Sequence, residues 1–173
     1  MGYAASMRTI YLFRHGKSDW DEPGGTDRER ALAPRGERAA RRMGRALTAL
    51  GETPHLALAS PARRAADTVR LAAEAGAWPG PIGTAPLYDV AAEDALRVVR
   101  DIDASHERVL LVGHEPTWSE LVERLTGAVV RFPTAAIARI DVPAARWADV
   151  RAGTGTLVWF LPPRVVGHLT GRG

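Results

Sequence analysis

Two arginines and two histidines each follow a short apolar segment of this chain. Arg14 and His15 come directly after the run IYLF, and His114 comes directly after the run VLLVG. Arg64 lies five residues after the run LALA. Short apolar runs bounded by glycine and polar residues are typical of buried strands. Because ligands bind at the carboxyl ends of the strands in open α/β sheets, we expect these four side chains to converge at that edge.

These residue types suit a tetrahedral oxyanion. The planar guanidinium group of arginine offers paired, charge-assisted hydrogen bonds to such an anion. A neutral imidazole can act as a nucleophile near pH 7, and a second imidazole can donate a hydrogen bond to oxygens that gain charge. Phosphoryl transfer needs mainly in-line positioning and charge stabilisation. The four residues therefore predict phosphoryl transfer with no metal ion and no other cofactor.

The spacing of apolar residues predicts the elements that would position these side chains. The predicted order implies an α/β fold, a three-layer α/β/α sandwich with a mostly parallel central sheet. Strands are predicted at residues 10–13, 56–59, 108–112, 136–142 and 156–161. Helices are predicted at residues 34–51, 60–76 and 117–127 and in the segment after Asp89, while residues 77–86 are too rich in turn-forming residues for a regular element.

Two helix starts are predicted from local capping signals. Ser60 is a preferred N-cap, and Pro61 is a preferred first helical residue. Arg64 would then lie in the first turn, where free N–H groups and the helix dipole attract an anion. Thr117 and Glu120 have the spacing of a capping box at the start of another helix.

Length and composition fit one domain with a full core, because the chain has 173 residues of which 46% are hydrophobic. We expect that domain at residues 8–173, after a disordered leader at residues 1–7. The absence of cysteine excludes disulfides, thiol catalysis and thiolate metal sites. No segment approaches the roughly 20 apolar residues of a membrane span. We therefore expect a cytoplasmic protein with no membrane partner.

The sequence pI of about 9.9 invites a nucleic-acid interpretation, although the formal net charge is only +3. The high pI arises because Lys17 is the only lysine and nearly all basic groups are arginines. The arginines alternate with acidic residues and form no basic tract, which is typical of a solvated surface. We expect no nucleic-acid partner, and a non-catalytic phosphate or nucleic-acid binder stays a further alternative.

The segments FRHGKSDW, DRERALAPRG, ASPARRAADT and VGHEPT resemble the histidine phosphatase superfamily, and within it the SixA-type phosphohistidine phosphatases. The resemblance implies the histidine phosphatase (phosphoglycerate mutase-like) fold. It also implies that His15 becomes phosphorylated, that Arg14 and Arg64 clasp the phosphoryl group, and that His114 stabilises the transition state.

The resemblance further suggests Asp89 as the catalytic acid, because larger relatives carry a glutamate at this position. The chain also lacks room for the lid insertion of larger members, and the loop Asp19–Arg30 is expected to border the pocket. A short, open site favours phosphohistidine on a protein as substrate. A small-molecule phosphomonoesterase or mutase acting on a small phosphate ester is the alternative.

Overall fold

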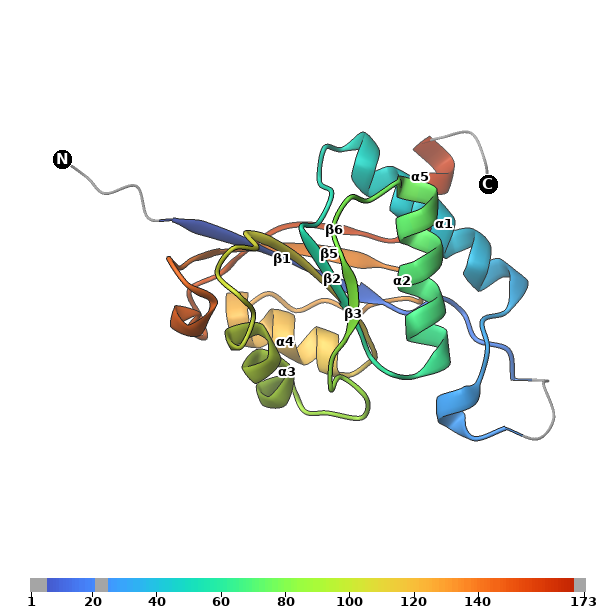
Figure 1. The fold of residues 1–173 in the computed structure, drawn as a ribbon, viewed down its shortest axis with the longest axis horizontal. Helices are drawn as coiled ribbons and strands as arrows, with labels where there is room; N and C mark the ends of the chain where they lie inside the picture. Colours follow the sequence, from blue (N-terminus) through green and yellow to red (C-terminus); the bar gives the residue numbers. More distant parts are fainter. Residues whose placement is uncertain (1–5, 21–24, 170–173) are drawn as a thin grey trace.

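A six-stranded sheet in the order β3-β2-β4-β1-β5-β6 runs through the part of the chain that the structure describes (Figure 1). The structure is a computed structural model that describes residues 6–20 and 25–169. The strands are β1 (Met7–Arg14), β2 (Leu56–Ala59), β3 (Ile82–Thr84), β4 (Arg108–Gly113), β5 (Ile137–Pro143) and β6 (Thr156–Leu161). The helices are α1 (Pro34–Ala49), α2 (Arg63–Gly76), α3 (Ala92–Arg100), α4 (Thr117–Thr126) and α5 (Pro163–Leu169), with short 3-10 helices η1 (Asp27–Glu29) and η2 (Trp147–Asp149).

The strand directions agree with the predicted, mostly parallel sheet. β1 pairs with β4, β4 with β2 and β2 with β3, each in parallel. β5 is antiparallel to β1, and β6 is antiparallel to β5. Parallel neighbours need crossover connections, which the helices supply. The carboxyl ends of β1, β2 and β4 therefore lie together at one edge of the sheet.

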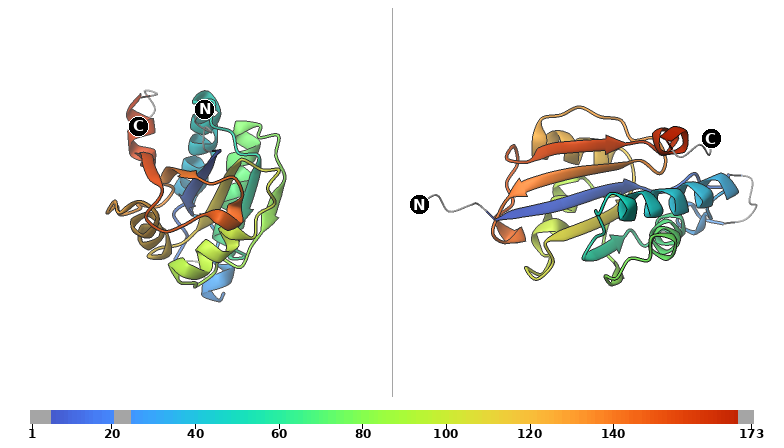
Figure 2. Two further views of the ribbon diagram at one scale, coloured as in Figure 1. Left: turned by 90° about the vertical axis from the view of Figure 1, so that its left-hand side faces the viewer. Right: turned by 90° about the horizontal axis from the view of Figure 1, so that it is seen from above.

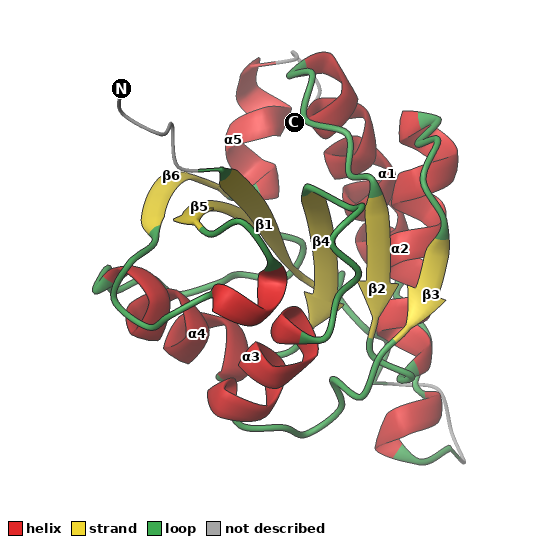
Figure 3. Ribbon diagram, turned by 60° about the vertical axis from the view of Figure 1, so that its left-hand side comes forward, coloured by secondary structure: helices red, strands yellow, loops and turns green. Residues whose placement is uncertain are grey.

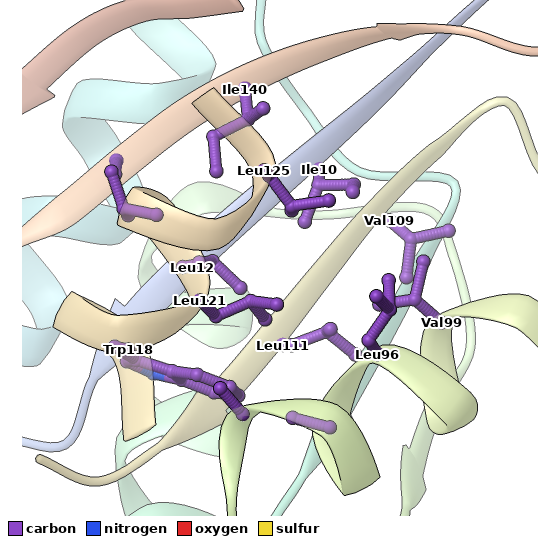
Figure 4. Close-up of a cluster of buried hydrophobic side chains, with 14 of the residues drawn as sticks. Ile10, Leu12, Leu96, Val99, Val109, Leu111, Trp118, Leu121, Leu125 and Ile140 are labelled. Atoms are coloured by element: carbon purple, nitrogen blue, oxygen red, sulfur yellow. The ribbon is translucent and has the colours of Figure 1, made fainter. Parts of the chain in front are cut away.

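Helices cover both faces of the sheet, with α1, α2 and α5 on one side and α3 and α4 on the other (Figures 2 and 3). Alternate side chains of β1 point to opposite faces. Ile10 and Leu12 pack with α3 and α4 (Figure 4), whereas Tyr11 and Phe13 pack with α1 and α2. β1 and β4 are thus buried on both faces, which explains their continuous apolar runs. The predicted three-layer α/β/α sandwich is confirmed.

The pairing of β1 with β4 fixes where the two predicted histidines leave the sheet. The register places Arg14 beside Gly113. The N–H of His15 donates to the carbonyl of Gly113, with an N···O distance of 3.1 Å. Because His15 and His114 are the next residues along these neighbouring strands, their side chains begin side by side.

Gly113 at the end of β4 allows a tryptophan ring to pack beneath the two strand ends. A Cβ atom at this position would lie 2.5 Å from the ring of Trp118. Trp118 is fully buried, and its indole N–H donates to the carbonyl of Phe13 at 2.9 Å. The ring therefore joins the first turn of α4 to the end of β1.

Besides the two short 3-10 helices, one strand and one α-helix were not predicted from the sequence. β3 forms within residues 77–86, where turn-forming residues predict no regular element. It is an edge strand whose hydrogen bonds come from β2, so its stability depends on a partner that local composition does not show. α5 begins at Pro163 and packs near α1.

Both predicted N-cap residues, Ser60 and Thr117, are wrong. The N-cap of α2 is Ala62, and α2 begins at Arg63 rather than at Pro61. α4 begins at Thr117 after an N-cap at Pro116, and the Thr117 hydroxyl donates to the carbonyl of Val90 at 2.7 Å and caps no helix N–H. The Ser60 hydroxyl still accepts from the N–H of Ala62 at 3.2 Å, whereas the Thr117 hydroxyl contacts a residue distant in the sequence.

The predicted leader at residues 1–7 overlaps the start of the sheet. Met7 is the first residue of β1, and the carbonyl of Ser6 accepts a hydrogen bond from the N–H of Ala144 at 3.0 Å. The rest of that leader, residues 1–5, lies outside the described residues. Among the helices in the described ranges, none is long and apolar enough to cross a membrane.

We predict that Gly113→Ala lowers the free energy of unfolding by about 1–3 kcal/mol, because the added methyl group must displace a buried ring. Urea denaturation followed by circular dichroism measures this change. Gly25→Ala is the control, since a Cβ atom there would make only an ordinary contact of 3.8 Å with Glu29. Equal stability of Gly113→Ala and the wild type would contradict the packing role of Gly113.

Candidate active site

A pocket of about 560 Å³ opens at the carboxyl ends of β1, β2 and β4. All five side chains singled out from the sequence line it: Arg14, His15, Arg64, Asp89 and His114. The ring centroids of His15 and His114 are 5.1 Å apart. Nη2 of Arg64 lies 3.5 Å from Nδ1 of His114. The structure therefore brings together groups that are up to a hundred residues apart in the sequence.

His15 presents an unprotonated Nε2 atom. Its Nδ1 lies 2.7 Å from the carbonyl oxygen of Gly16. Because a carbonyl only accepts hydrogen bonds, Nδ1 carries the proton and the lone pair is on Nε2. Burial is the main reason that the pKa of His15 is lowered to about 3. The hydrogen bond to Gly16 opposes this shift, and the nearby His114, Arg64 and Arg14 contribute to it. At neutral pH the ring is therefore neutral and keeps a lone pair on Nε2, which is what a nitrogen nucleophile requires.

The backbone of Gly16, whose carbonyl sets this tautomer, is itself held by α2. The N–H of Gly16 donates to Oγ1 of Thr68 at 2.9 Å, and the same hydroxyl donates to the carbonyl of Arg64 at 2.7 Å. Thr68 is fully buried, so no water competes for its hydroxyl group. One threonine thus connects the backbone beside His15 to the helix that carries Arg64.

His114 is oriented by Ser60 and Arg64. Its Nε2 lies 2.8 Å from Oγ of Ser60, which also accepts from the N–H of Ala62 at 3.2 Å. Arginine can only donate, so the approach of Arg64 to Nδ1 assigns the lone pair to Nδ1 and the proton to Nε2. The pKa of His114 is lowered to about 4, mainly by burial and also by the charges of Arg64 and Arg14, while the charge of Asp89 opposes the shift.

The two arginines are fixed by different partners. Nη1 of Arg14 donates to the carbonyl of Phe132 at 2.6 Å. Burial lowers the pKa of Arg14, and the charge of Glu115 opposes this shift. Arg64 lies in the first turn of α2 and donates through Nη2 to Oδ2 of Asp27 at 2.9 Å. Arg64 is buried and Arg14 is half-buried, and the hydrogen bonds of each restrict the movement of its guanidinium group at the pocket.

Asp89 lines the same pocket, next to Tyr88. Its φ of +52° is a left-handed conformation, which aspartate tolerates better than most residues. The Tyr88 ring meets His114 edge-on, with centroids 5.7 Å apart. Asp27, from the loop Asp19–Arg30, also lines the pocket, so this loop borders it as expected.

Comparison with known proteins decides the family. The family model of the histidine phosphatase superfamily (branch 1) matches residues 10–82. An uncharacterised protein of Mycobacterium tuberculosis is 36% identical over 162 residues, which span 87% of this chain and 99% of that protein. The chain belongs to the histidine phosphatase superfamily. This membership supports a phosphatase, an enzyme that acts on phosphorylated substrates.

Solved structures of other proteins share the fold of this chain. A proposed phosphohistidine phosphatase SixA of Agrobacterium tumefaciens superposes with a TM-score of 0.77 at 26% identity, covering 90% of this chain and 98% of that one. A mycobacterial glucosyl-3-phosphoglycerate phosphatase superposes with a TM-score of 0.62 at 16% identity, covering 90% and 99%. The histidine phosphatase fold predicted from the sequence is confirmed.

The side chains of Asp27, Ser60 and Thr68 hydrogen-bond to Arg64, His114 and Gly16, and the sequence did not assign these three residues a role in the site. Ser60 was expected only as a helix cap. All three lie in segments that carry the resemblance to the superfamily. That location was the available signal, but a single sequence does not show which side chains they contact.

We predict that His15 makes stability depend on pH. Its pKa is about 3 in the folded protein and returns toward 6.5 on unfolding, so the unfolded chain binds more protons between these values. The contribution of His15 to stability is complete above pH 6.5 and is lost as the pH falls toward 3. Urea denaturation across this range should therefore show a weaker loss of stability for His15→Asn than for the wild type. Parallel curves would contradict the neutral, buried state of His15.

Proposed function

We propose that this protein is a metal-independent phosphatase that removes phosphate from phosphohistidine on a protein through a phosphohistidine intermediate at His15. The observation that carries the proposal is the juxtaposition of two imidazoles, 5.1 Å apart, with two guanidinium groups in one pocket. This set supplies a nucleophile, a hydrogen-bond donor and two positive charges for one phosphoryl group.

In the first step, the Nε2 lone pair of His15 forms a bond to phosphorus. The phosphorus–nitrogen bond of the substrate breaks, and its electron pair stays on the leaving imidazole, which takes a proton from Asp89 or water. In the second step, water attacks phosphorus and releases a proton, and the bond to His15 breaks with its electron pair returning to Nε2. The products are inorganic phosphate and the dephosphorylated histidine.

Arg14 and Arg64 neutralise the phosphoryl oxygens in both steps. A bound oxyanion beside Nδ1 of His114 favours protonation of that ring, because the negative charge offsets the burial that disfavours the cation. His114 then donates a hydrogen bond to an oxygen that gains charge in the transition state. The positive charge that a metal ion would otherwise supply comes from these side chains.

The carboxylates that line the pocket support a phosphohistidine substrate. Asp27, Asp89, Glu115 and Glu120 surround the phosphate-binding groups. These side chains would repel a substrate that carries a second anionic group behind its phosphoryl group. An imidazole leaving group is neutral, or cationic once protonated, so it suits this environment. The chain also lacks room for a lid insertion, and the resulting short, open site favours phosphohistidine on a protein as well.

A small-molecule phosphomonoesterase is the second candidate. Its support is the fold shared with the glucosyl-3-phosphoglycerate phosphatase, together with a pocket volume of about 560 Å³ that is in the usual range for small ligands. The pocket carboxylates argue against substrates with an additional carboxylate or phosphate group.

We predict that the protein carries acid-labile, base-stable ³²P after rapid quenching of turnover, and that His15→Ala abolishes this label. Arg64→Ala and His114→Ala should each slow the chemical step by about 10²–10³-fold, because each removes a group that stabilises the transition state. His168→Ala is the matched control, since His168 is exposed on α5 and lies away from the pocket lining. Near-wild-type turnover in His114→Ala would contradict the role of His114.

We also predict that a phosphorylated phosphotransfer domain is hydrolysed with a higher kcat/KM than any member of a panel of nucleotide and sugar phosphates. Phosphate release measured at matched concentrations tests this preference. Faster turnover of a sugar phosphate would establish the second candidate. Salt-sensitive binding of RNA or DNA without any phosphatase activity would contradict both enzymatic proposals.

A further inference from the structure

One carboxylate that the proposed mechanism does not use is bound to the phosphate-binding arginine. The backbone carbonyl of Asp27 accepts from Nη1 of Arg64 at 2.5 Å, and its Oδ2 accepts from Nη2 at 2.9 Å. Oδ2 also accepts from the Tyr88 hydroxyl at 2.9 Å, and Oδ1 pairs with Arg30. Both carboxylate oxygens of Asp27 are therefore engaged by donors from separate segments of the chain.

Arg64 needs such a partner because its position is unfavourable for a cation. It is only 6% exposed, and burial lowers its pKa. It also lies in the first turn of α2, where the positive end of the helix dipole disfavours a cation. Among the residues that the structure describes, Asp27 is the acidic residue that forms an ion pair with Arg64. A buried arginine without a counter-charge would turn toward solvent or lose stability.

Asp27 is itself held in place. It is the first residue of η1, which lies beside the start of α2 (Figure 3). The N–H of Thr26 donates to Oε2 of Glu29 at 3.0 Å and closes the turn. The guanidinium carbon of Arg30 lies 3.5 Å from the ring centroid of Trp20. These contacts support the turn that places the carboxylate within hydrogen-bonding distance of Arg64.

The geometry of Nη2 shows what this acceptor does. An Nη nitrogen carries two hydrogens in the plane of the guanidinium group. In Arg64, Oδ2 of Asp27 takes one of them, and the nitrogen lies 3.5 Å from Nδ1 of His114 on the pocket side. The second hydrogen is therefore left for the pocket, where it faces Nδ1 of His114 and where an entering phosphoryl oxygen would meet both Arg64 and His114.

We propose that Asp27 is a positioning residue for the phosphate site: it orients Arg64 so that one N–H faces the phosphoryl group. This inference rests on the proposed function, because it assigns the same pocket to phosphate. Electrostatic repulsion by Asp27 would change the affinity for an anionic ligand in the opposite direction. A carboxylate that merely repels an anionic ligand weakens binding, whereas a carboxylate that orients the arginine strengthens it.

Asp27→Asn keeps the shape of the side chain but removes its charge and replaces one acceptor with a donor. We predict that tungstate, a tetrahedral oxyanion, binds this variant about 10- to 100-fold more weakly than the wild type in calorimetric titration, since a charge-assisted hydrogen bond is lost. The kcat/KM for phosphohistidine should fall by a similar factor. Asp101→Asn is the control, because Asp101 is exposed at the end of α3 and lies outside the pocket lining.

A double-mutant cycle tests whether Asp27 acts through Arg64. In an Arg64→Ala background, Asp27→Asn should change tungstate affinity no further. Tyr88→Phe removes one donor to Asp27 and should weaken tungstate binding by a smaller factor, which keeps the test decisive if Asp27→Asn does not fold. Tighter tungstate binding by Asp27→Asn would overturn the inference. So would a loss of affinity on Asp27→Asn that is as large in the Arg64→Ala background as in the wild type.

Tungstate titration separates this inference from the proposed function because it requires no turnover. If the wild type binds tungstate in an Asp27-dependent manner but hydrolyses no phosphohistidine, the positioning role stands and the proposed substrate is wrong. If phosphohistidine is hydrolysed equally well with and without the Asp27 carboxylate, the proposed function stands and the positioning role is wrong. Absence of tungstate binding by the folded wild type would overturn both.

Discussion

The parallel pairing of β1 with β4 is the constraint on which the rest of the site depends. Their register sets Arg14 beside Gly113, so the two histidines that follow leave the sheet as neighbours. A shift of one residue would turn alternate side chains to the other face of a sheet that is buried on both sides. The two apolar faces of β1 therefore hold the register that brings His15 and His114 together.

Burial gives these histidines their chemical character. Both rings have lowered pKa values, with burial as the first cause and neighbouring arginines as a further one. A neutral His15 with its proton fixed on Nδ1 can act as a nucleophile without a separate base. The same burial makes two nearby guanidinium groups costly, and carboxylates at the pocket wall offset this cost. Asp27 is bonded to Arg64, and the charge of Glu115 acts on Arg14.

Local sequence signals failed where tertiary contacts competed for the same atoms. Ser60 has the residue type of an N-cap, yet its hydroxyl group contacts His114 as well as the N–H of Ala62. Thr117 has capping-box spacing, yet it donates to Val90. In both cases a hydroxyl group forms a bond with a residue distant in sequence, which local propensity cannot foresee. β3 was missed for a related reason, since its hydrogen bonds come from β2.

The sequence by itself determined the fold class, because buried parallel strands need continuous apolar runs. It also indicated Arg14, His15, Arg64 and His114 as site residues, because they follow such runs and ligand sites lie where those runs stop. It also indicated the family through the segments around these residues. Only the tertiary structure decided how each group is held: the tautomer of His15, the contact of Ser60 with His114, and the ion pair of Arg64 with Asp27. These depend on distances between side chains on separate elements, and the spacing of residues along one chain does not encode such distances.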